Sequence, residues 1–171
     1  RLITYNAKVT RLMQGAGGVT VTYADAKSGK VGTAEADFCV CTIPLTVLSQ
    51  IETNLSEKKQ AAIQAVPYSP GGKVALEMRR RFWEEDYAIY GGHSFTNQEI
   101  GLVSYPNDRL LSDGPAVLLG AFANGPGGLH LGGMTPQQRI EAALAQGSVF
   151  HPDSYRKEFL SGASVSWSRV P

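Results

Sequence analysis

The sequence has little cysteine, no long apolar run and no excess of charge of one sign. Its two cysteines, Cys39 and Cys41, lie two residues apart in a strand-like segment. A disulfide between such neighbours would be strained, so we predict two free cysteines packed in a core. No stretch approaches the roughly 18 apolar residues of a membrane helix. The net charge is +1, and acidic residues 84–86 follow the one basic cluster, 79–81. This distribution excludes an extended phosphate-binding surface, so neither a membrane nor a nucleic acid is expected as a partner.

Motifs for metal and nucleophilic chemistry are also missing. His93, His130 and His151 lie far apart, without a HExxH or His/Cys/Cys spacing, so no metal site is predicted. There is no GxSxG elbow, and neither cysteine has an evident base partner. The acidic run 84–86 could supply paired catalytic carboxylates, but such runs are more often solvated turns. Acid–base or covalent catalysis by these residues is therefore not the favoured interpretation.

Alternating and continuous apolar runs predict the strands. Residues 2–14 and 19–23 alternate around Gly15–Gly18, which indicates a β-hairpin, since a phosphate loop would need a helix after the glycines. The nearly continuous apolar run 36–42 is typical of a strand buried on both faces in a parallel sheet. Further strands are expected at 73–79, 100–105, 116–122 and 164–170.

Two helices have clear start signals. Ser56 can cap a helix that runs to about Ala65, and Thr135, with Pro136 and Gln138 behind it, opens another that ends near Gly147. The glycine-rich stretch 125–133 is expected to be a loop. The mixed order of strands and helices predicts an α/β (α+β) fold, with a sheet covered by helices.

Lys73 is the most unusual charged residue of these strands. It opens an apolar strand and shares a face with Ala75 and Glu77. Such a lysine either reaches water from a sheet edge, or lies partly buried and holds a water or tunes a cofactor. The residues alone leave both interpretations open, and the first is the more frequent.

The motifs together resemble the flavin amine oxidase family, within which the L-amino-acid oxidases look nearest. The resemblance covers nearly the whole chain and depends on the order and spacing of short motifs. These are Ala7-Lys-Val9, Gly18-Val-Thr-Val-Thr-Tyr23, Ala36 to Pro44, Gly72-Lys-Val74, Phe82-Trp83, Gly91-Gly92 and Tyr105-Pro-Asn107.

The resemblance implies the fold and the domains. Residues 1–50 would form the later part of a doubly wound FAD-binding domain. Residues 51–157 would form a substrate-binding domain with a mixed β-sheet and helices, and 158–171 would return toward the flavin. The cofactor implied is FAD, and no metal is implied.

The resemblance also assigns four residues. Lys73 matches the lysine that holds a water against flavin N5. The resemblance therefore favours the cofactor role of Lys73 over a lysine that reaches solvent from a sheet edge. Tyr105 is similar to the tyrosine that donates its hydroxyl to the substrate α-carboxylate, with a core aromatic as the alternative. Val9 matches the residue whose backbone reads the adenine edge. Trp167 resembles the tryptophan of a W-x-x-x-x-Y-x-x-G segment that packs near the flavin.

Several parts of the family pattern are absent. The sequence has no GxGxxG phosphate loop and no C-terminal flavin-contacting segment, and it runs from Arg1 to Pro171. We therefore expect a fragment or one chain of a proteolytically processed hetero-oligomer, whose other chains carry these segments. The resemblance implies an L-amino-acid oxidase that forms hydrogen peroxide, with an L-glutamate oxidase as one candidate, and the family's habits suggest secretion, although the residues leave the compartment open. The alternatives are an amine or polyamine oxidase of the same fold and a non-catalytic binding module.

Overall fold

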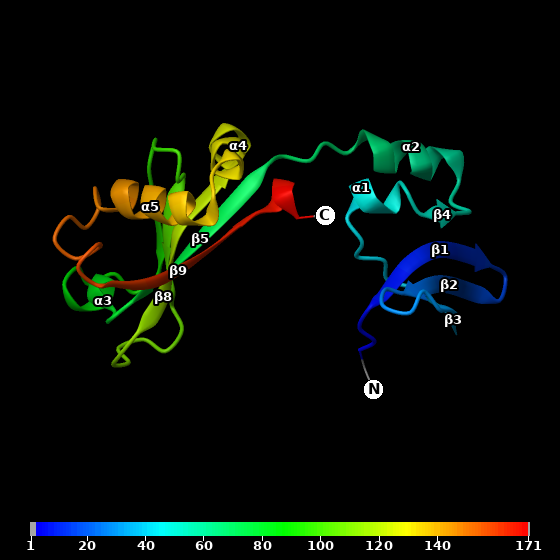
Figure 1. Cartoon of the computed structure of the whole chain (residues 1–171), viewed down its shortest axis with the longest axis horizontal. Coiled ribbons are helices and arrows are strands. Elements are labelled where there is room, and N and C mark those ends of the chain that lie inside the picture. Colours follow the sequence, from blue (N-terminus) through cyan, green and yellow to red (C-terminus); the bar gives the residue numbers. More distant parts are fainter. Residues whose placement is uncertain (1–2, 171) are drawn as a thin grey trace. The chain divides into compact units, whose positions relative to one another are not determined.

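The chain folds as two units that divide between Pro67 and Tyr68 (Figure 1). The computed structural model describes residues 3–170, and each unit is described by itself. The expectations about Arg1 and Pro171 fall outside these residues. The predicted division into 1–50, 51–157 and 158–171 concerns the domains of a whole enzyme, and it stays a prediction.

The first unit has a four-stranded sheet in the order β3-β2-β1-β4. Its strands are β1 (Ala7–Gly15), β2 (Gly18–Asp25), β3 (Val31–Ala36) and β4 (Glu52–Thr53). The predicted hairpin is confirmed, because β1 and β2 pair antiparallel from Ala7↔Asp25 to Gly15↔Gly18. Gly18 has φ of +118°, and a Cβ there would lie 2.4 Å from the carbonyl oxygen of Ala36. The turn therefore requires glycine at this position.

Two helices complete this unit, α1 (Leu45–Leu48) and α2 (Glu57–Ala65). The predicted start of α2 is confirmed, since the Ser56 hydroxyl accepts a hydrogen bond from the backbone N–H of Lys59. Leu48 is the one large apolar side chain of this unit that is buried among the described residues. The unit is therefore held together mainly by sheet pairing, and it has little core of its own.

The prediction of a buried strand over 36–42 is wrong for this chain. Strand β3 ends at Ala36, and residues 37–43 form no strand. Phe38 and Val40 are 90% and 89% exposed, and Cys39 and Cys41 are exposed free cysteines instead of core residues. A strand needs a hydrogen-bonded neighbour, and no neighbour for this segment exists among residues 3–170.

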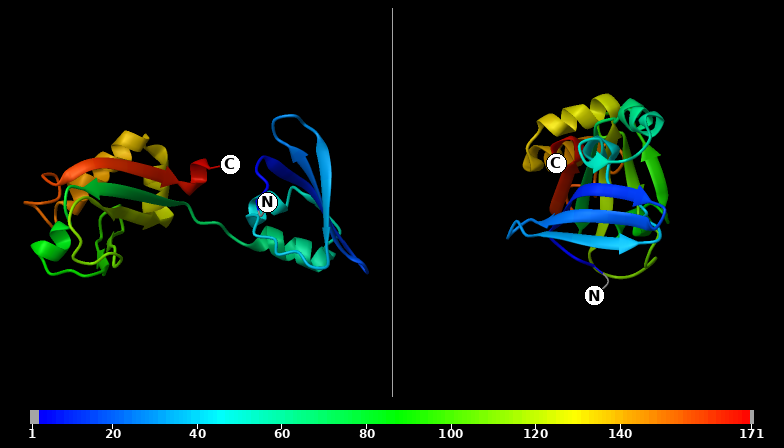
Figure 2. Two further views of the ribbon diagram at one scale, coloured as in Figure 1. Left: turned by 90° about the horizontal axis from the view of Figure 1, so that it is seen from below. Right: turned by 90° about the vertical axis from the view of Figure 1, so that its right-hand side faces the viewer.

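The second unit is built on an antiparallel sheet in the order β6-β7-β8-β5-β9 (Figure 2). The central strand β5 (Gly71–Met78) pairs with β8 (Ala116–Asn124) and β9 (Phe159–Ser166). Strands β6 (Gly92–Phe95) and β7 (Leu102–Tyr105) extend the sheet beyond β8. The strands predicted at 73–79, 100–105 and 116–122 are confirmed with shifted ends, whereas β6 was not predicted. The strand predicted over 164–170 is confirmed only as far as Ser166, because β9 begins earlier and residues 167–169 form a 3₁₀ helix.

Two helices, α4 (Gly125–Gly133) and α5 (Pro136–Gly147), pack on one face of this sheet. The capping box predicted at Thr135 and Gln138 is confirmed. The loop predicted at 125–133 is wrong, because these residues form α4. A Cβ on Gly128 would lie 2.3 Å from the carbonyl oxygen of Pro70, so glycine lets the helix approach the strand closely. That tertiary contact outweighs the low helix propensity of glycine.

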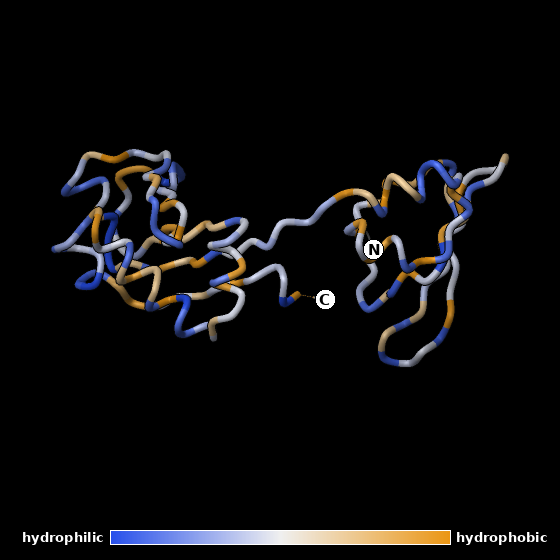
Figure 3. Tube along the Cα trace, turned by 90° about the horizontal axis from the view of Figure 1, so that it is seen from above, coloured by the Kyte–Doolittle hydropathy of each residue, from blue (hydrophilic) through white to orange (hydrophobic). Residues whose placement is uncertain are grey.

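The hydrophobic core lies between these helices and the sheet. It also takes in α3 (Phe82–Glu85), whose Phe82 and Trp83 are fully buried. Apolar and polar residues alternate along the chain in both units (Figure 3). No helix within residues 3–170 is long and apolar enough to cross a membrane. The predicted mixed α/β class with helix-covered sheet is confirmed.

Candidate functional site

Strand β5 presents one face to the helices and leaves the other open. Its side chains Val74, Leu76 and Met78 are fully buried in the core. The alternate residues Lys73, Ala75 and Glu77 are partly buried and lie on the other face. Within the described residues, α4 and α5 pack on the opposite face, against the buried side chains. We call the face that carries Lys73 the open face of the sheet.

Lys73 is the middle residue of a row that crosses three strands on the open face. Phe122 of β8 and Val165 of β9 are its cross-strand partners. The Lys73 Nζ lies 4.6 Å from the centroid of the Phe122 ring, so the ring face attracts the ammonium. Among residues 3–170, no carboxylate forms an ion pair with Lys73 (Glu77, on the same face, is hydrogen-bonded by Ser161). The ammonium is therefore free for an external partner.

Trp167 lies at the same end of the open face as Lys73. It begins the short 3₁₀ helix η1 (Trp167–Arg169) directly after β9, and it is 56% exposed. A Cβ on Gly71, the residue two before Lys73, would lie 3.5 Å from Trp167 Cδ1. The structure thus brings two of the four predicted site residues together. The roles predicted for them are not tested by this placement.

Tyr105 does not share this face. It ends β7 one residue after Ser104, which pairs with Leu119 of β8, the partner of Ala75. Successive side chains of a strand point to opposite faces. Ser104 is therefore on the open face and Tyr105 is on the helix-covered face, only 4% exposed. This position matches the alternative of a core aromatic, and the carboxylate-binding role of Tyr105 stays a prediction.

The Tyr105 hydroxyl already has two partners. It is 2.7 Å from His151 Nε2 and 3.0 Å from Ser94 Oγ. Burial raises the pKa of Tyr105 and lowers the pKa of His151. The His151 ring packs among the rings of Phe82, Tyr87, Phe150 and Tyr155, and its Nδ1 has no partner within the described residues. This buried pair ties the segment after α5 to β7.

We expect this histidine to make stability depend on pH. As the pH falls below about 6.5, the unfolded chain binds a proton at His151 before the folded protein does, because burial lowers the folded pKa. The free energy of unfolding therefore falls until the folded pKa is passed. His151→Gln should flatten this slope in urea unfolding between pH 7 and 5. Exposed His93→Gln is the control, and an equal slope in both variants would contradict the assignment.

Val9 belongs to the first unit. It pairs with Tyr23 of β2, and a β-bulge follows it before Arg11. On the other edge of β1, strand β4 pairs only with Arg11 and Leu12. Beside Val9, this edge has no neighbouring strand within residues 3–170. The position is compatible with backbone recognition of a ligand edge, and the adenine role stays a prediction.

The acidic run predicted to be a solvated turn is partly buried. Glu84 is 3% exposed and forms an ion pair with Arg81, which is also 3% exposed. The hydrogen bond from Arg81 holds the pKa of Glu84 below its ordinary value. Glu85 and Asp86 instead bind Arg80 at the surface. The prediction holds for Glu85 and Asp86 and is wrong for Glu84, whose partner three residues earlier covers it.

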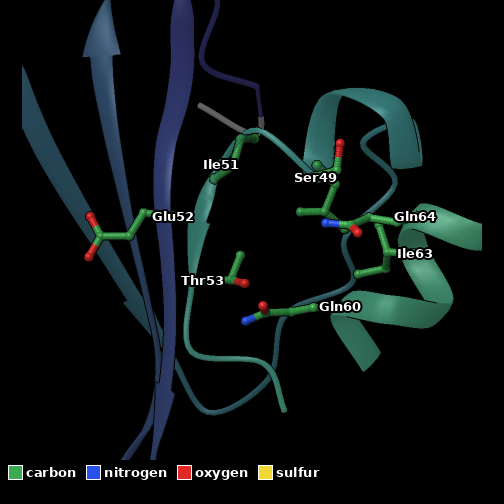
Figure 4. A pocket seen from close by; sticks show the side chains of 8 residues that line it. Ser49, Ile51, Glu52, Thr53, Gln60, Ile63 and Gln64 are labelled. Carbon is green, nitrogen blue, oxygen red and sulfur yellow. The ribbon is translucent and has the colours of Figure 1, made fainter. Parts of the chain in front are cut away.

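Lys73 lines neither of two hollows found among residues 3–170. One of about 200 Å³ lies between α1, β4 and α2 in the first unit. Figure 4 shows Gln60 and Ile63 of α2 near Thr53 there, whereas Glu52 points away toward β1, where it pairs with Arg11. This hollow has no other titratable side chain. A second, of about 390 Å³, is bordered by Asn124 and the exposed pair His130–Glu99.

The sequence did not point to three further residues near Lys73. Phe122 and Ser104 share the open face with it, and Asn124 is the last residue of the neighbouring strand β8. None of them is charged, and their face depends on the register between strands far apart in the chain. Strand alternation alone could have indicated that Ser104 and Tyr105 point to opposite faces of the sheet, but not which of the two shares a face with Lys73. It could not have given the pairing itself.

Comparison with known proteins agrees with these observations. The chain is 38% identical over 124 residues to the flavin-dependent L-tryptophan oxidase RebO of Lentzea aerocolonigenes, covering 72% of this chain and 26% of that protein. It is 28% identical over 172 residues to the L-amino-acid oxidase of Siganus canaliculatus, covering 99% of this chain and 32% of that protein.

The fold is shared with a solved structure. Cyclohexylamine oxidase from Brevibacterium oxydans IH-35A superimposes with a TM-score of 0.70 at 20% identity, covering 95% of this chain and 34% of that chain. The chain thus spans about a third of the length of these proteins. Residues 2–171 match the family described as flavin containing amine oxidoreductase. The chain belongs to this family.

Proposed function

We propose that this chain is part of an FAD-dependent L-amino-acid oxidase, which converts an L-amino acid, water and oxygen into a 2-oxo acid, ammonia and hydrogen peroxide. FAD is the cofactor of the family. The observation that carries the proposal is the unpaired ammonium of Lys73 at one end of the open face, beside exposed Trp167. The relatives named L-amino-acid oxidase and L-tryptophan oxidase support the substrate class.

The residues present suit a flavin ring. A planar aromatic system that gains negative charge needs an aromatic surface and a nearby cation, and Trp167 and Lys73 offer both. They do not suit the diphosphate, because Gly15–Gly18 forms a hairpin turn and precedes no helix. Residues beyond this chain would hold it. We propose that the remaining two thirds of the enzyme supply that loop and the C-terminal flavin segment, as further chains or segments.

The bound cofactor and the residues of this chain would have different roles in the reaction. Bound FAD supplies a two-electron acceptor for the Cα–H bond and a route to oxygen. Lys73 would hold a water molecule through its ammonium and favour negative charge on the atom opposite it. Phe122 and Val165, its cross-strand partners, lie on either side of the lysine. Val9 would contact the adenine through its backbone. L-glutamate stays one candidate substrate.

Matched substrates test the proposal. The complete enzyme is assayed for peroxide with L-leucine against 3-methylbutylamine and with L-glutamate against 4-aminobutanoate, pairs that differ by the α-carboxylate. A site built to bind that carboxylate should prefer each amino acid by about 10⁴-fold in kcat/KM. Preference for the amines would instead show an amine oxidase. A colourless protein without peroxide release would show a binding module.

A further inference from the structure

Gly71 is covered by two side chains although it lies on the open face. It is the alternate neighbour of Lys73 on β5 and pairs with Asn124 of β8. A Cβ on Gly71 would lie 3.1 Å from Asn124 Oδ1 and 3.5 Å from Trp167 Cδ1. Gly71 itself is buried. Both side chains therefore extend over it, and we call Gly71, Lys73, Asn124 and Trp167 the Gly71 seat.

Asn124 lies at the N-cap position of α4 but does not cap the helix with its side chain. It precedes α4, where asparagine usually caps the first turn with its side chain. Here it makes no such bond, and the backbone N–H of Gly125 donates to the carbonyl of Pro70 and to Ser69 Oγ. Within residues 3–170 the Asn124 amide has no hydrogen-bond partner. Its exposed side chain lies beside Gly71 instead, with both donors open to solvent or to a ligand.

The Gly71 seat has more donors than acceptors. Lys73 offers an ammonium, Asn124 an amide NH₂ and Trp167 an indole N–H, which is bonded to the Cδ1 atom that faces Gly71. None of these donors has an acceptor within the described part of the chain. Diagonal neighbours such as Lys73 and Asn124 lie about 7–8 Å apart, so one small group can contact both. The group that fits is rich in acceptors, as a carboxylate or a carboxamide is.

We propose that Asn124 is a substrate-binding residue, and that it selects amino acids whose side chain ends in a carboxylate or carboxamide. This inference rests on the proposed function and adds the substrate class to it. Asn124 donates to the terminal oxygen of the substrate side chain, and the Trp167 N–H supplies a second donor. The α-carboxylate is bound elsewhere. Apolar side chains leave the Asn124 donors without a partner, which disfavours such substrates.

Binding of non-oxidisable analogues tests the inference without turnover. The complete enzyme with FAD is titrated calorimetrically with 2-hydroxyglutarate and with 2-hydroxy-4-methylpentanoate. Asn124→Leu keeps the approximate shape and removes the donors. It should weaken 2-hydroxyglutarate by about tenfold and change the apolar analogue by less than about twofold. Asn124→Asp should weaken 2-hydroxyglutarate further, since it places like charges together. Asn107→Leu, an exposed asparagine after β7, should leave both affinities unchanged.

Other outcomes overturn the inference. Equal weakening of both analogues would show that Asn124 contacts the shared α-carboxylate end. A changed dissociation constant for FAD would show that the amide binds a flavin carbonyl. Unchanged affinities would show that it binds nothing. A wild-type enzyme that oxidises no L-amino acid would instead refute the proposed function, and the ratio of affinities between wild type and Asn124→Leu would still report on Asn124.

Discussion

Lys73→Met in the complete enzyme should lower amino-acid turnover and flavin reoxidation by oxygen by about 10²–10³-fold. Methionine keeps the length and apolar character of the lysine stem between Phe122 and Val165. It removes the charge that we propose to act on the reacting centre. Stopped-flow absorbance separates flavin reduction from reoxidation, and peroxide release gives the turnover.

The control for this variant is Lys58→Met, an exposed lysine of α2. It should leave both rates at the wild-type level. The FAD content and thermal unfolding of Lys73→Met should also match the wild type, because this lysine makes no ion pair within the described residues. Wild-type rates in Lys73→Met would show that the ammonium has no part in the reaction.

Breaking the buried Arg81–Glu84 pair should cost about 3–5 kcal/mol of unfolding free energy. The Arg81 guanidinium lies 2.6 Å from Glu84 Oε1 and donates to the carbonyl of Asp108. Glu84 Oε2 accepts the backbone N–H of Leu111 at 2.8 Å. Arg81→Met leaves the Glu84 carboxylate buried without its counter-charge. Urea unfolding of the purified protein measures the loss.

A double variant distinguishes the contribution of the ion pair from the cost of leaving one charge buried alone. Arg81→Met with Glu84→Leu leaves no buried charge, so its cost should be smaller than the sum of the single losses. The control is Glu141→Gln, which breaks the exposed pair with Arg156 and should cost at most about 1 kcal/mol. Single losses as small as this control would show that the buried pair contributes little.

The same pair fixes the loop that follows β7. Arg109 and Leu111 have φ of +49° and +57°, a region that costs energy for residues other than glycine. The bonds from Arg81 and Glu84 to the backbone of Asp108 and Leu111 hold this conformation. The single variants should therefore also loosen the loop, which limited proteolysis would detect.

Local signals in the sequence were sufficient for the hairpin and for the capped helices α2 and α5. The glycines between β1 and β2, Ser56, and the Thr135–Gln138 box each act within a few residues. Signals that depend on distant partners were not sufficient. Helix α4 packs on the sheet because Gly128 lets it approach Pro70, and residues 37–43 stay unpaired because no neighbouring strand is among the described residues.

The candidate site shows the same division. Lys73 was identified by its charge on an apolar strand and by the family resemblance, and its placement on the open face agrees with the predicted alternation. The face of Tyr105 follows from the register between β7 and β8, which the sequence does not contain. Phe122 and Asn124 carry no charge, and only their pairing with Lys73 and Gly71 marks them as neighbours of the site.

The exposed apolar segment 37–43 has a practical consequence for producing this protein. An unpaired run with exposed Phe38 and Val40 can add as a strand to another molecule. Its two exposed thiols can be oxidised. We expect this chain to form inclusion bodies when it is synthesised alone in bacteria. Co-synthesis with the rest of the enzyme, under reducing conditions, should recover it in the supernatant.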